Sequence, residues 1–504
     1  MSRDTYLHGY DISGDQYPGI NAAAMSAVLG DKATALKISN EIIRKLTDYA
    51  ESYWDVATLG EAYLLTGNVA QAESYYHKAV SVAGERIGDI NSTYHQLLFL
   101  NGYLDIPESV IDLLAPPRVV AFSGHMIDAS DRVKPRFPES VAPNVKRKLG
   151  ELIDKENIGV VFCSAACGAD IVFLEALLER GGRANVVLPF KEEDFIGTSV
   201  AFAGGQWEKR FRAILKRATV YRATAEGYFG GDDIYRFLGR IIIGKCLLRC
   251  AELSADPMLV TVATPGSERK AGGVIDTIEQ WPQSYRRINV DPARFIDSAD
   301  ATFGSPCPDP DVPAKLLRKG RSLPYQVRHT IKCILFADIV GYSKIEEEQT
   351  PFFMHEIFGV ISDRLTSLDQ PPEIINTWGD AIFIVYERAE HIIQMAMQLR
   401  AIFIGTDWSK KGLPEDLNIR IALHAGPIFV AVDPIRDEIN GYGSHINRTA
   451  RIEPITLPGS IYASSEFAAL LKVETGDAYQ YEYVGRLELP KNAGLQDVYH
   501  ISSR

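Results

Sequence analysis

The 504-residue sequence contains little cysteine, no long apolar run and no excess of basic charge. Six cysteines are too few for a disulfide scaffold, which fits a reducing compartment. A membrane span needs roughly 18 to 20 uninterrupted apolar residues, and the richest stretch, RFLGRIIIGKCLLRC, is broken by Arg240, Lys245 and Arg249. With 53 Lys and Arg against 65 Asp and Glu, the net charge of -12 disfavours binding to a nucleic-acid polymer.

The first residues, MSRDTYLHGYDISGD, have no apolar core that could act as a secretion signal, so we expect a cytoplasmic protein. Hydrophobic residues make up 46% of the chain and charged residues 23%, which is typical of globular domains. At roughly 150 residues per domain, the length predicts about three folded units. We predict an all-α helical repeat first, an α/β parallel-sheet domain in the centre and an α+β domain last.

Residues 1–112 have small and apolar residues at helical spacing. Within YWDVATLGEAYLLTGNVAQAESYYHKAV, six residues fall on the offsets of the 34-residue tetratricopeptide pattern: Leu59, Gly60, Tyr63, Ala72, Tyr76 and Ala79. A degenerate partner hairpin precedes it, with Gly30 and Asp31 at its turn. The region resembles tetratricopeptide-like helical repeats, and both a structural packing role and a partner-binding surface remain open.

Residues 113–290 alternate between strand-like and helix-like segments, which predicts a parallel sheet with helices on its faces. Ligands bind such sheets at the carboxyl ends of the strands, where Gly124 and Gly168 lie in short loops. A helix N-terminus after Gly168 favours an anion. The domain is similar to Rossmann-like nucleotide-sensing modules of the SLOG type. A ligand-sensing domain, a scaffold without ligand and a second catalytic site all remain open.

Residues 291–328 include four prolines between Pro306 and Pro313 and are predicted to be a linker. In residues 329–504, Asp338 ends the apolar strand IKCILFADIV, and Asp380 lies at the tip of the hairpin EIINTWGDAIFIVY. If the hairpin pairs beside that strand, the two carboxylates converge. Paired carboxylates suit two divalent cations, Mg²⁺ or Mn²⁺, bound to a triphosphate. Alternatively, Asp380 is only a turn residue and Asp338 only a polar strand end.

Asn447 and Arg451 are four residues apart, so they share one face of a predicted helix. An amide and a guanidinium that point at one place can hold a ribose and neutralise charge that develops on a phosphate. This pair gives the C-terminal region a second group of side chains suited to a nucleotide.

Four stretches, FADIVGYS, NTWGDAIFIVY, RIALHAGP and GYGSHINRTARI, resemble the signature stretches of class III nucleotidyl cyclases in order and spacing. The resemblance implies a ferredoxin-like α+β catalytic domain over 329–504, with two divalent cations at Asp338, Ile339 and Asp380. It also implies that Asn447 orients the ribose, that Arg451 stabilises the transition state and that Lys491 holds the triphosphate. The implied reaction closes a 3′,5′-cyclic nucleotide and expels pyrophosphate.

In this family the metal aspartates and the Asn/Arg pair act from opposite subunits, so the resemblance implies a homodimer with two composite sites. Adenine-using members carry Lys and Asp at the positions of Asn376 and Asn440, and guanine-using members typically carry Glu and Cys. Neither purine pattern is met. An amide both donates and accepts, so by itself it pairs with any base edge.

Trp378 shares a strand face with Asn376 and Asp380. If its ring enters the base site, it takes up room that a purine needs, which favours UTP or CTP. The whole then resembles the pyrimidine cyclases of Pycsar antiphage systems, in which cyclic UMP or CMP triggers a separate effector. Alternatively, Trp378 packs on the core. An adenylate cyclase with an atypical base pocket and a catalytically inactive nucleotide-binding regulator also remain open.

Overall fold

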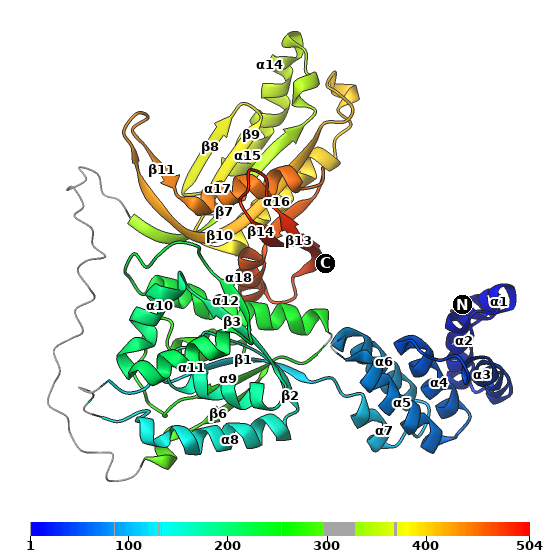
Figure 1. Cartoon of the computed structure of the whole chain (residues 1–504). Helices are drawn as coiled ribbons and strands as arrows, with labels where there is room; N and C mark the ends of the chain where they lie inside the picture. The colour runs from blue at the N-terminus through cyan, green and yellow to red at the C-terminus, as the bar shows by residue number, and fades with distance from the viewer. Residues whose placement is uncertain are drawn as a thin grey trace. The chain divides into compact units, whose positions relative to one another are not determined.

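The computed structural model describes residues 2–84, 86–129, 132, 134–253, 255–296, 328–366 and 370–504 (Figure 1). The chain divides into two compact units, Met1–Arg118 with Cys250–Ala255 and Val119–Arg249 with Asp256–Arg504. Among the helices within these residues, none is both long and apolar enough to cross a membrane.

The first unit is helical. Its elements are α1 (Ser2–Ser13), α2 (Gln16–Val28), α3 (Lys32–Leu46), α4 (Tyr53–Leu65), α5 (Val69–Ala83), α6 (Ile87–Asn101) and α7 (Glu108–Leu113). Side chains of Asp31, Ser52 and Asn68 accept hydrogen bonds from the backbone N–H groups that begin α3, α4 and α5. These caps satisfy donors that a helix start leaves without a partner, and they fix where each helix begins.

Both predicted hairpins are present in the helical unit. The ring of Tyr76 on α5 is fully buried against Gly60 of α4, where a Cβ atom would come within 2.6 Å of the ring. The earlier hairpin, α2–α3, turns at Gly30, whose φ is +81°. Tyr76 and Gly60 thus lie at the centre of the α4–α5 contact, while the tetratricopeptide likeness itself stays a prediction.

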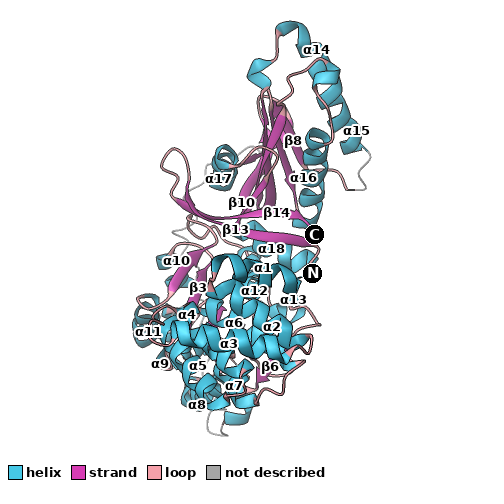
Figure 2. Ribbon diagram, turned by 90° about the vertical axis from the view of Figure 1, so that its right-hand side faces the viewer, coloured by secondary structure: helices cyan, strands magenta, loops and turns pink. Residues whose placement is uncertain are grey.

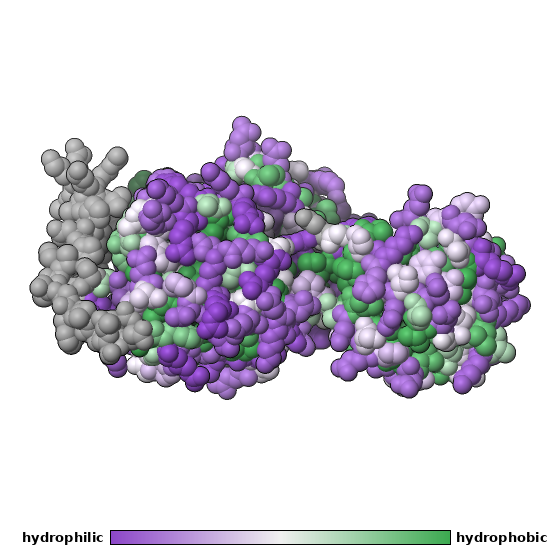
Figure 3. Space-filling view, turned by 60° about the horizontal axis from the view of Figure 1, so that its bottom comes forward, coloured by the Kyte–Doolittle hydropathy of each residue, from purple (hydrophilic) through white to green (hydrophobic). Residues whose placement is uncertain are grey.

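Large hydrophobic side chains remain exposed on the helical unit, where apolar residues appear in green at the right of Figure 3. The exposed side chains are Ile12, Tyr17, Leu29, Leu36, Tyr49, Trp54, Leu98, Phe99 and Tyr103. Partner binding by this unit stays a prediction.

The second unit begins with a six-stranded sheet whose strands are β1 (Arg118–Gly124), β2 (Ile158–Cys163), β3 (Arg183–Leu188), β4 (Thr219–Arg222), β5 (Met258–Val262) and β6 (Arg286–Val290). Their order is β4-β3-β2-β1-β5-β6, and β5, for example, pairs parallel with both β1 and β6. Strands β2 to β4 follow on one side of β1, and β5 and β6 follow on its other side, so the strand order switches between β1 and β5. Open α/β sheets bind ligands at such a switch point. The helices are α8 (Ala142–Lys155), α9 (Ala169–Glu179), α10 (Glu192–Ser199), α11 (Gly205–Leu215), α12 (Asp233–Glu252) and α13 (Val274–Gln280), with α8, α9 and α11 on one face in Figure 1.

The C-terminal part of the same unit is built on an eight-stranded sheet. Its strands are β7 (Arg328–Val340), β8 (Ile374–Trp378), β9 (Ala381–Tyr386), β10 (Asn418–Asp433), β11 (Glu438–Tyr442), β12 (Ile461–Ser464), β13 (Tyr479–Glu488) and β14 (Leu495–Ser503). The order is β13-β14-β12-β10-β7-β9-β8, and β11 pairs with β10. Strands β7 to β10 form the antiparallel core of a βαββαβ arrangement.

Helices flank this sheet on both sides, and Figure 2 shows α17 (Ser444–Ile452) on one face and α16 (Ala389–Ile404) on the other. Besides short 3₁₀ turns, this part also contains α14 (Thr350–Phe353), a π-helical turn at Met354–Gly359, α15 (Val360–Thr366) and α18 (Ser465–Thr475). Ile446 of α17 packs on a cluster that includes the buried side chains of Ile374, Phe383 and Ile428. This apolar contact holds the polar side of α17 away from the sheet.

The predicted succession of helices, parallel sheet and α+β region is confirmed, while the domain boundaries stay predictions. Most of the predicted linker, residues 297–327, lies outside the described residues. Within its described part, Pro292–Phe295 form a 3₁₀ turn, and β7 begins at Arg328.

Candidate functional site

Asp338 and Asp380 lie together at one edge of the C-terminal sheet. The β7–β9 ladder pairs Asp338 with Ala381, the residue after Asp380, and Asp380 is in the turn between β8 and β9. Gly379 supplies the positive φ, +66°, of that turn. Burial and the neighbouring charge of Asp380 raise the pKa of Asp338. The two carboxylates therefore converge and repel each other.

Two further charged residues surround this pair, and the sequence reasoning missed both. Arg420 lies directly opposite Asp338 in the β7–β10 ladder, so the two side chains share a face. Burial and the charges of Asp338 and Asp380 raise the pKa of Glu453 to about 7, while Arg420 opposes that shift. The sequence could have indicated Arg420, because it is the first residue of the stretch RIALHAGP. Nothing in the sequence indicated Glu453.

The donor set at this edge fits hard divalent cations. Carboxylate oxygens are the ligands that Mg²⁺ and Mn²⁺ prefer, and a cation would relieve the repulsion that raises the pKa of Asp338. Within the described part of the chain, no group of three His, Cys, Asp or Glu side chains is placed to hold a metal. The side chain of Ile339 is 1% exposed and apolar, so only its backbone carbonyl is available as a ligand.

Asn447, Arg451 and Lys491 line one cavity of about 280 Å³, together with Ala225, Ser444, His445, Arg448 and Ala493. Asn447 and Arg451 come from α17, while Lys491 lies in the turn between β13 and β14 with a φ of +58°. Three predicted residues are thus brought together from two segments of the chain. Neither Asp338 nor Asp380 lines this cavity.

The predicted base-reading amides contact each other. Asn376 Nδ2 donates to Asn440 Oδ1 over 3.2 Å, and Arg436 Nη1 donates to Asn376 Oδ1 over 2.9 Å. Asn376 is only 6% exposed. Arg436 was not predicted from the sequence, because its position in the turn between β10 and β11 carried no recognisable signal.

Trp378 packs on the core, and its entry into the base site stays a prediction. Its ring stacks on Phe336 at 5.8 Å and on Phe383 at 5.7 Å between centroids. The side chain nevertheless stays 49% exposed. One part of the indole therefore packs on the core while the rest remains accessible beside Asn376.

The central sheet domain contacts the helix that carries Asn447 and Arg451. His445 Nε2 is 2.9 Å from Thr224 Oγ1, just after β4, and His445 Nδ1 is 2.8 Å from His424 Nε2. The chain of hydrogen bonds ends at Ser464 Oγ, 2.7 Å from His424 Nδ1. Both imidazoles are buried, and burial lowers the pKa of His424 to about 3.

Gly124 and Gly168, the predicted ligand loop of the central domain, pack against neighbouring chain. A Cβ atom on Gly124 would overlap Ala169, and one on Gly168 would come within 2.7 Å of His125 O. The backbone N–H of Ala169 at the start of α9 donates to that same carbonyl. Side-chain packing accounts for Gly124 and close backbone packing for Gly168, and ligand binding in this domain stays a prediction.

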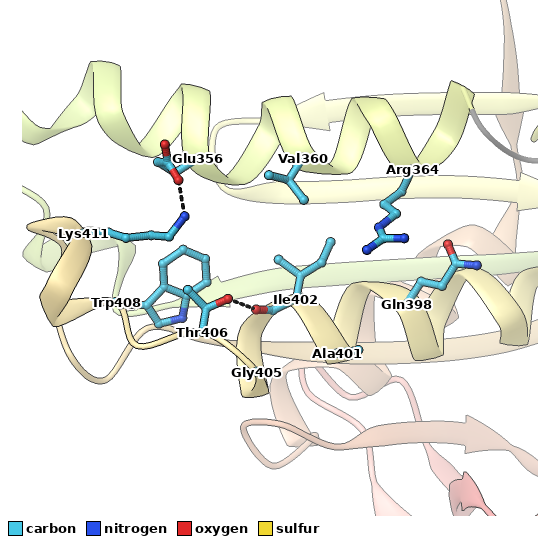
Figure 4. A pocket seen from close by; sticks show the side chains of 10 residues that line it. All are labelled: Glu356, Val360, Arg364, Gln398, Ala401, Ile402, Gly405, Thr406, Trp408 and Lys411. Carbon is cyan, nitrogen blue, oxygen red and sulfur yellow. Dashed lines mark hydrogen bonds and ion pairs between the residues drawn. The ribbon is translucent and has the colours of Figure 1, made fainter.

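A second cavity of about 510 Å³ lies between the Met354–Thr366 helical segment and α16 with the loop after it (Figure 4). Its wall includes Arg364, Gln398, Trp408 and an ion pair between Lys411 and Glu356. None of the predicted site residues lines it.

Residues 325–503 match the sequence model of the family described as adenylate and guanylate cyclase catalytic domain. The C-terminal region is therefore a catalytic domain of this type. Guanylyl cyclase C of Rattus norvegicus is 30% identical over 185 residues, and guanylate cyclase 2G of the same species is 26% identical over 181 residues. Each match covers 34% of this chain and 16% of the relative, so the chain spans less than a fifth of their length.

A putative adenylate cyclase 3 of Rhizobium meliloti is 24% identical over 143 residues, which is 27% of this chain and 23% of the relative. Among solved structures, the adenylyl cyclase CyaB from P. aeruginosa is 17% identical with a TM-score of 0.32, covering 36% of this chain and 97% of its own. The guanylyl cyclase Cya2 is 19% identical with a TM-score of 0.30, covering 35% and 93%.

Proposed function

We propose that this protein is a nucleotidyl cyclase that converts a nucleoside triphosphate into a 3′,5′-cyclic nucleotide and pyrophosphate. The observation that carries the proposal is the convergence of Asp338 with Asp380 within the region that matches the cyclase family. The gathering of Asn447, Arg451 and Lys491 in a single cavity supports it. A catalytically inactive regulator would have no need of both groups.

Each residue has a distinct role in this proposal. The ribose 3′-hydroxyl attacks the α-phosphorus, and the bond to the β-phosphate oxygen breaks. Asp338 and Asp380 would hold two divalent cations, which when bound would lower the pKa of the hydroxyl, so that its proton leaves to water, and would neutralise charge on the triphosphate. Asn447 orients the ribose, so that the hydroxyl stays in line. Arg451 and Lys491 offset the charge that grows on the phosphates.

The proposed active form is a head-to-tail homodimer. Asp338 and Asp380 do not line the cavity that contains Asn447, Arg451 and Lys491. In a head-to-tail dimer, the aspartates of each subunit face the cavity residues of the other subunit, which gives two equivalent composite sites. We expect a monomeric variant to lose activity while keeping its fold.

The proposed substrate is a pyrimidine nucleoside triphosphate, UTP or CTP. Asn376 and Asn440 match neither purine pattern, and the half-exposed side chain of Trp378 is on the same strand as Asn376, two residues further along. The proposed product is cyclic UMP or cyclic CMP, which would act on a separate effector in antiphage defence. The names of the relatives, guanylate and adenylate cyclases, make the purine nucleotides the alternative.

The test is to incubate the purified full-length protein with each of the four nucleoside triphosphates and Mn²⁺ and to identify cyclic products by mass. We expect one product class in the wild type and a loss of roughly 100-fold or more in Asp338→Asn and Asp380→Asn, because each removes a metal ligand. Asp407→Asn, at an exposed carboxylate in the same domain, is the matched control. Undiminished activity in either aspartate variant would contradict the proposal.

A further inference from the structure

We propose that Arg436 determines base specificity by turning the base site into a hydrogen-bond donor surface, so that the enzyme selects a keto base over an amino base. Uracil and guanine are the keto bases, and cytosine and adenine are the amino bases. The inference rests on the proposed function, which places the base beside Asn376, Asn440 and Trp378. It adds a residue and a chemical criterion that the amides alone do not supply.

Arg436 fixes the orientation of the Asn376 amide. Its Nη1 donates to Asn376 Oδ1 over 2.9 Å, and Asn376 is 6% exposed, so water cannot substitute freely for this bond. A guanidinium has five N–H donors and no acceptor. The oxygen of Asn376 must therefore face Arg436, and its NH₂ group must face the other side. Arg436 thereby reinforces the orientation that Asn440 Oδ1 imposes on the NH₂ group of the same amide.

Asn440 fixes the same orientation of Asn376 from the other side. Asn376 Nδ2 donates to Asn440 Oδ1 over 3.2 Å, and the backbone N–H of Gly441 donates to the same oxygen over 2.8 Å. These bonds use both lone pairs of that oxygen. At its other end, the Asn440 amide hydrogen bonds to the carboxylate of Asp433. Arg436 and Asp433 belong to one turn, so a donor and an acceptor on the same turn fix both amides.

The remaining hydrogen-bonding capacity of the amide pair is mostly that of a donor. Asn376 Oδ1 is engaged by Arg436, and Asn440 Oδ1 is engaged twice. Two kinds of donor remain available to a base. One is the second N–H of Asn376, and the other is the set of Arg436 N–H groups that are not bonded to Asn376 or Glu438. A site of this kind is complementary to an oxygen and opposed to an amino group.

The four bases differ at this point. Uracil O4 and guanine O6 accept hydrogen bonds, whereas cytosine N4 and adenine N6 carry NH₂ groups that donate. An amino base would set donor against donor and leave the buried N–H of Asn376 unpaired, which is the costly case. Of the two keto bases, uracil is the smaller and leaves more room beside the indole of Trp378. UTP is therefore the expected substrate.

The experiment presents the full-length protein with an equimolar mixture of the four nucleoside triphosphates and Mn²⁺ and quantifies the cyclic products by mass. We expect uridine and guanosine products to exceed cytidine and adenosine products by roughly tenfold or more. Products mainly from CTP or ATP would overturn this inference while leaving the cyclase proposal intact. No cyclic product from any nucleotide would overturn the cyclase proposal, and this inference with it.

The role of Arg436 is tested with Arg436→Glu and Arg436→Gln. Glutamate only accepts, so it removes the donors of Arg436 and places an acceptor beside the amides, and it should lower the ratio of kcat/KM for UTP to that for CTP roughly tenfold. Glutamine both donates and accepts, so it should give an intermediate ratio and serves if the glutamate variant fails to fold. Lys410→Glu is the control, because that side chain is 82% exposed. An equal loss for all four nucleotides, with unchanged ratios, would mean that Arg436 is only structural.

Discussion

Thr224 Oγ1 and His445 Nε2 are 2.9 Å apart, so a residue of the central sheet domain hydrogen bonds to the first turn of α17. Two residues further along the same helix is Asn447, which lines the cavity with Arg451. Ala225, next to Thr224, lines this cavity too. The central domain is therefore in contact with the helix that presents two of the proposed catalytic side chains.

Thr224→Val removes the hydroxyl with almost no change in shape. It leaves a buried ring nitrogen of His445 without its partner, which costs about 1–3 kcal/mol, and α17 is expected to shift. We predict that the rate of cyclic nucleotide formation falls roughly tenfold, because small misplacements of catalytic groups are costly. The measurement is kcat for the preferred nucleotide. The control is Thr219→Val, at an exposed position on β4, the strand that precedes Thr224, and equal rates in the two variants would contradict the prediction.

Low pH should destabilise the C-terminal domain through its buried histidine pair. Burial holds the pKa of His424 at about 3, and burial with the charge of Arg448 holds the pKa of His445 well below its usual value. The unfolded chain binds protons below pH 6.5, whereas these folded imidazoles do not, so stability falls between pH 6.5 and about 3. The loss by pH 5 is about 2 kcal/mol for His424, and His445 acts in the same direction.

The check is urea unfolding of the wild type and of His445→Asn at pH 7.5 and pH 5.0. The variant should lose less stability than the wild type over this interval, whatever its stability at pH 7.5. His355→Asn serves as the control, because the His355 side chain is 85% exposed. A variant with the same pH dependence as the wild type would show that His445 does not remain neutral in the folded protein.

The helical unit should behave in the opposite sense with pH. Glu61 is buried, and burial raises its pKa to about 7, while a hydrogen bond from Gln96 opposes the shift. Because the folded protein binds this proton more tightly than the unfolded chain, the proton contributes about 3 kcal/mol to the free energy of unfolding below pH 4.5. This contribution is lost as the pH rises through 7. Glu61→Gln keeps the shape and removes the charge.

We therefore expect Glu61→Gln to gain stability over the wild type as pH is raised from 5 to 8, measured by chemical denaturation of the full-length chain with a probe in the helical unit. The control is Glu51→Gln at an exposed position. A difference between wild type and Glu61→Gln that does not grow with pH would contradict the prediction.

Helices α12 and α18 approach so closely that only glycine fits at position 244. A Cβ atom there would overlap the backbone of Ala469 on α18, whereas the nearest atom to a Cβ at Gly239, on the same helix, is 3.7 Å away. Gly244→Ala should therefore destabilise the second unit. Gly239→Ala should stabilise it slightly, by about 0.5–1 kcal/mol, because alanine favours a helix over glycine. The two variants are compared by thermal unfolding, and equal shifts would refute the close contact.

The sequence by itself determined the local pieces of this protein. Strand and helix periods placed the hairpin around Asp380, the helix with Asn447 and Arg451 and the turn at Gly30, because such signals depend on neighbours within a few residues. The order of the motifs was enough to identify a cyclase catalytic domain, and it matches the family model over residues 325–503.

Only the tertiary structure decided which of these pieces touch. Arg436 reaches Asn376 across 60 residues of sequence, and Thr224 reaches His445 across 221. Arg420 lies opposite Asp338 because of the register between β7 and β10. Strand order, register and domain packing are set by the burial of whole faces of the sheet, and no local pattern contains that information. The orientation of the base-reading amides is therefore a property of the fold.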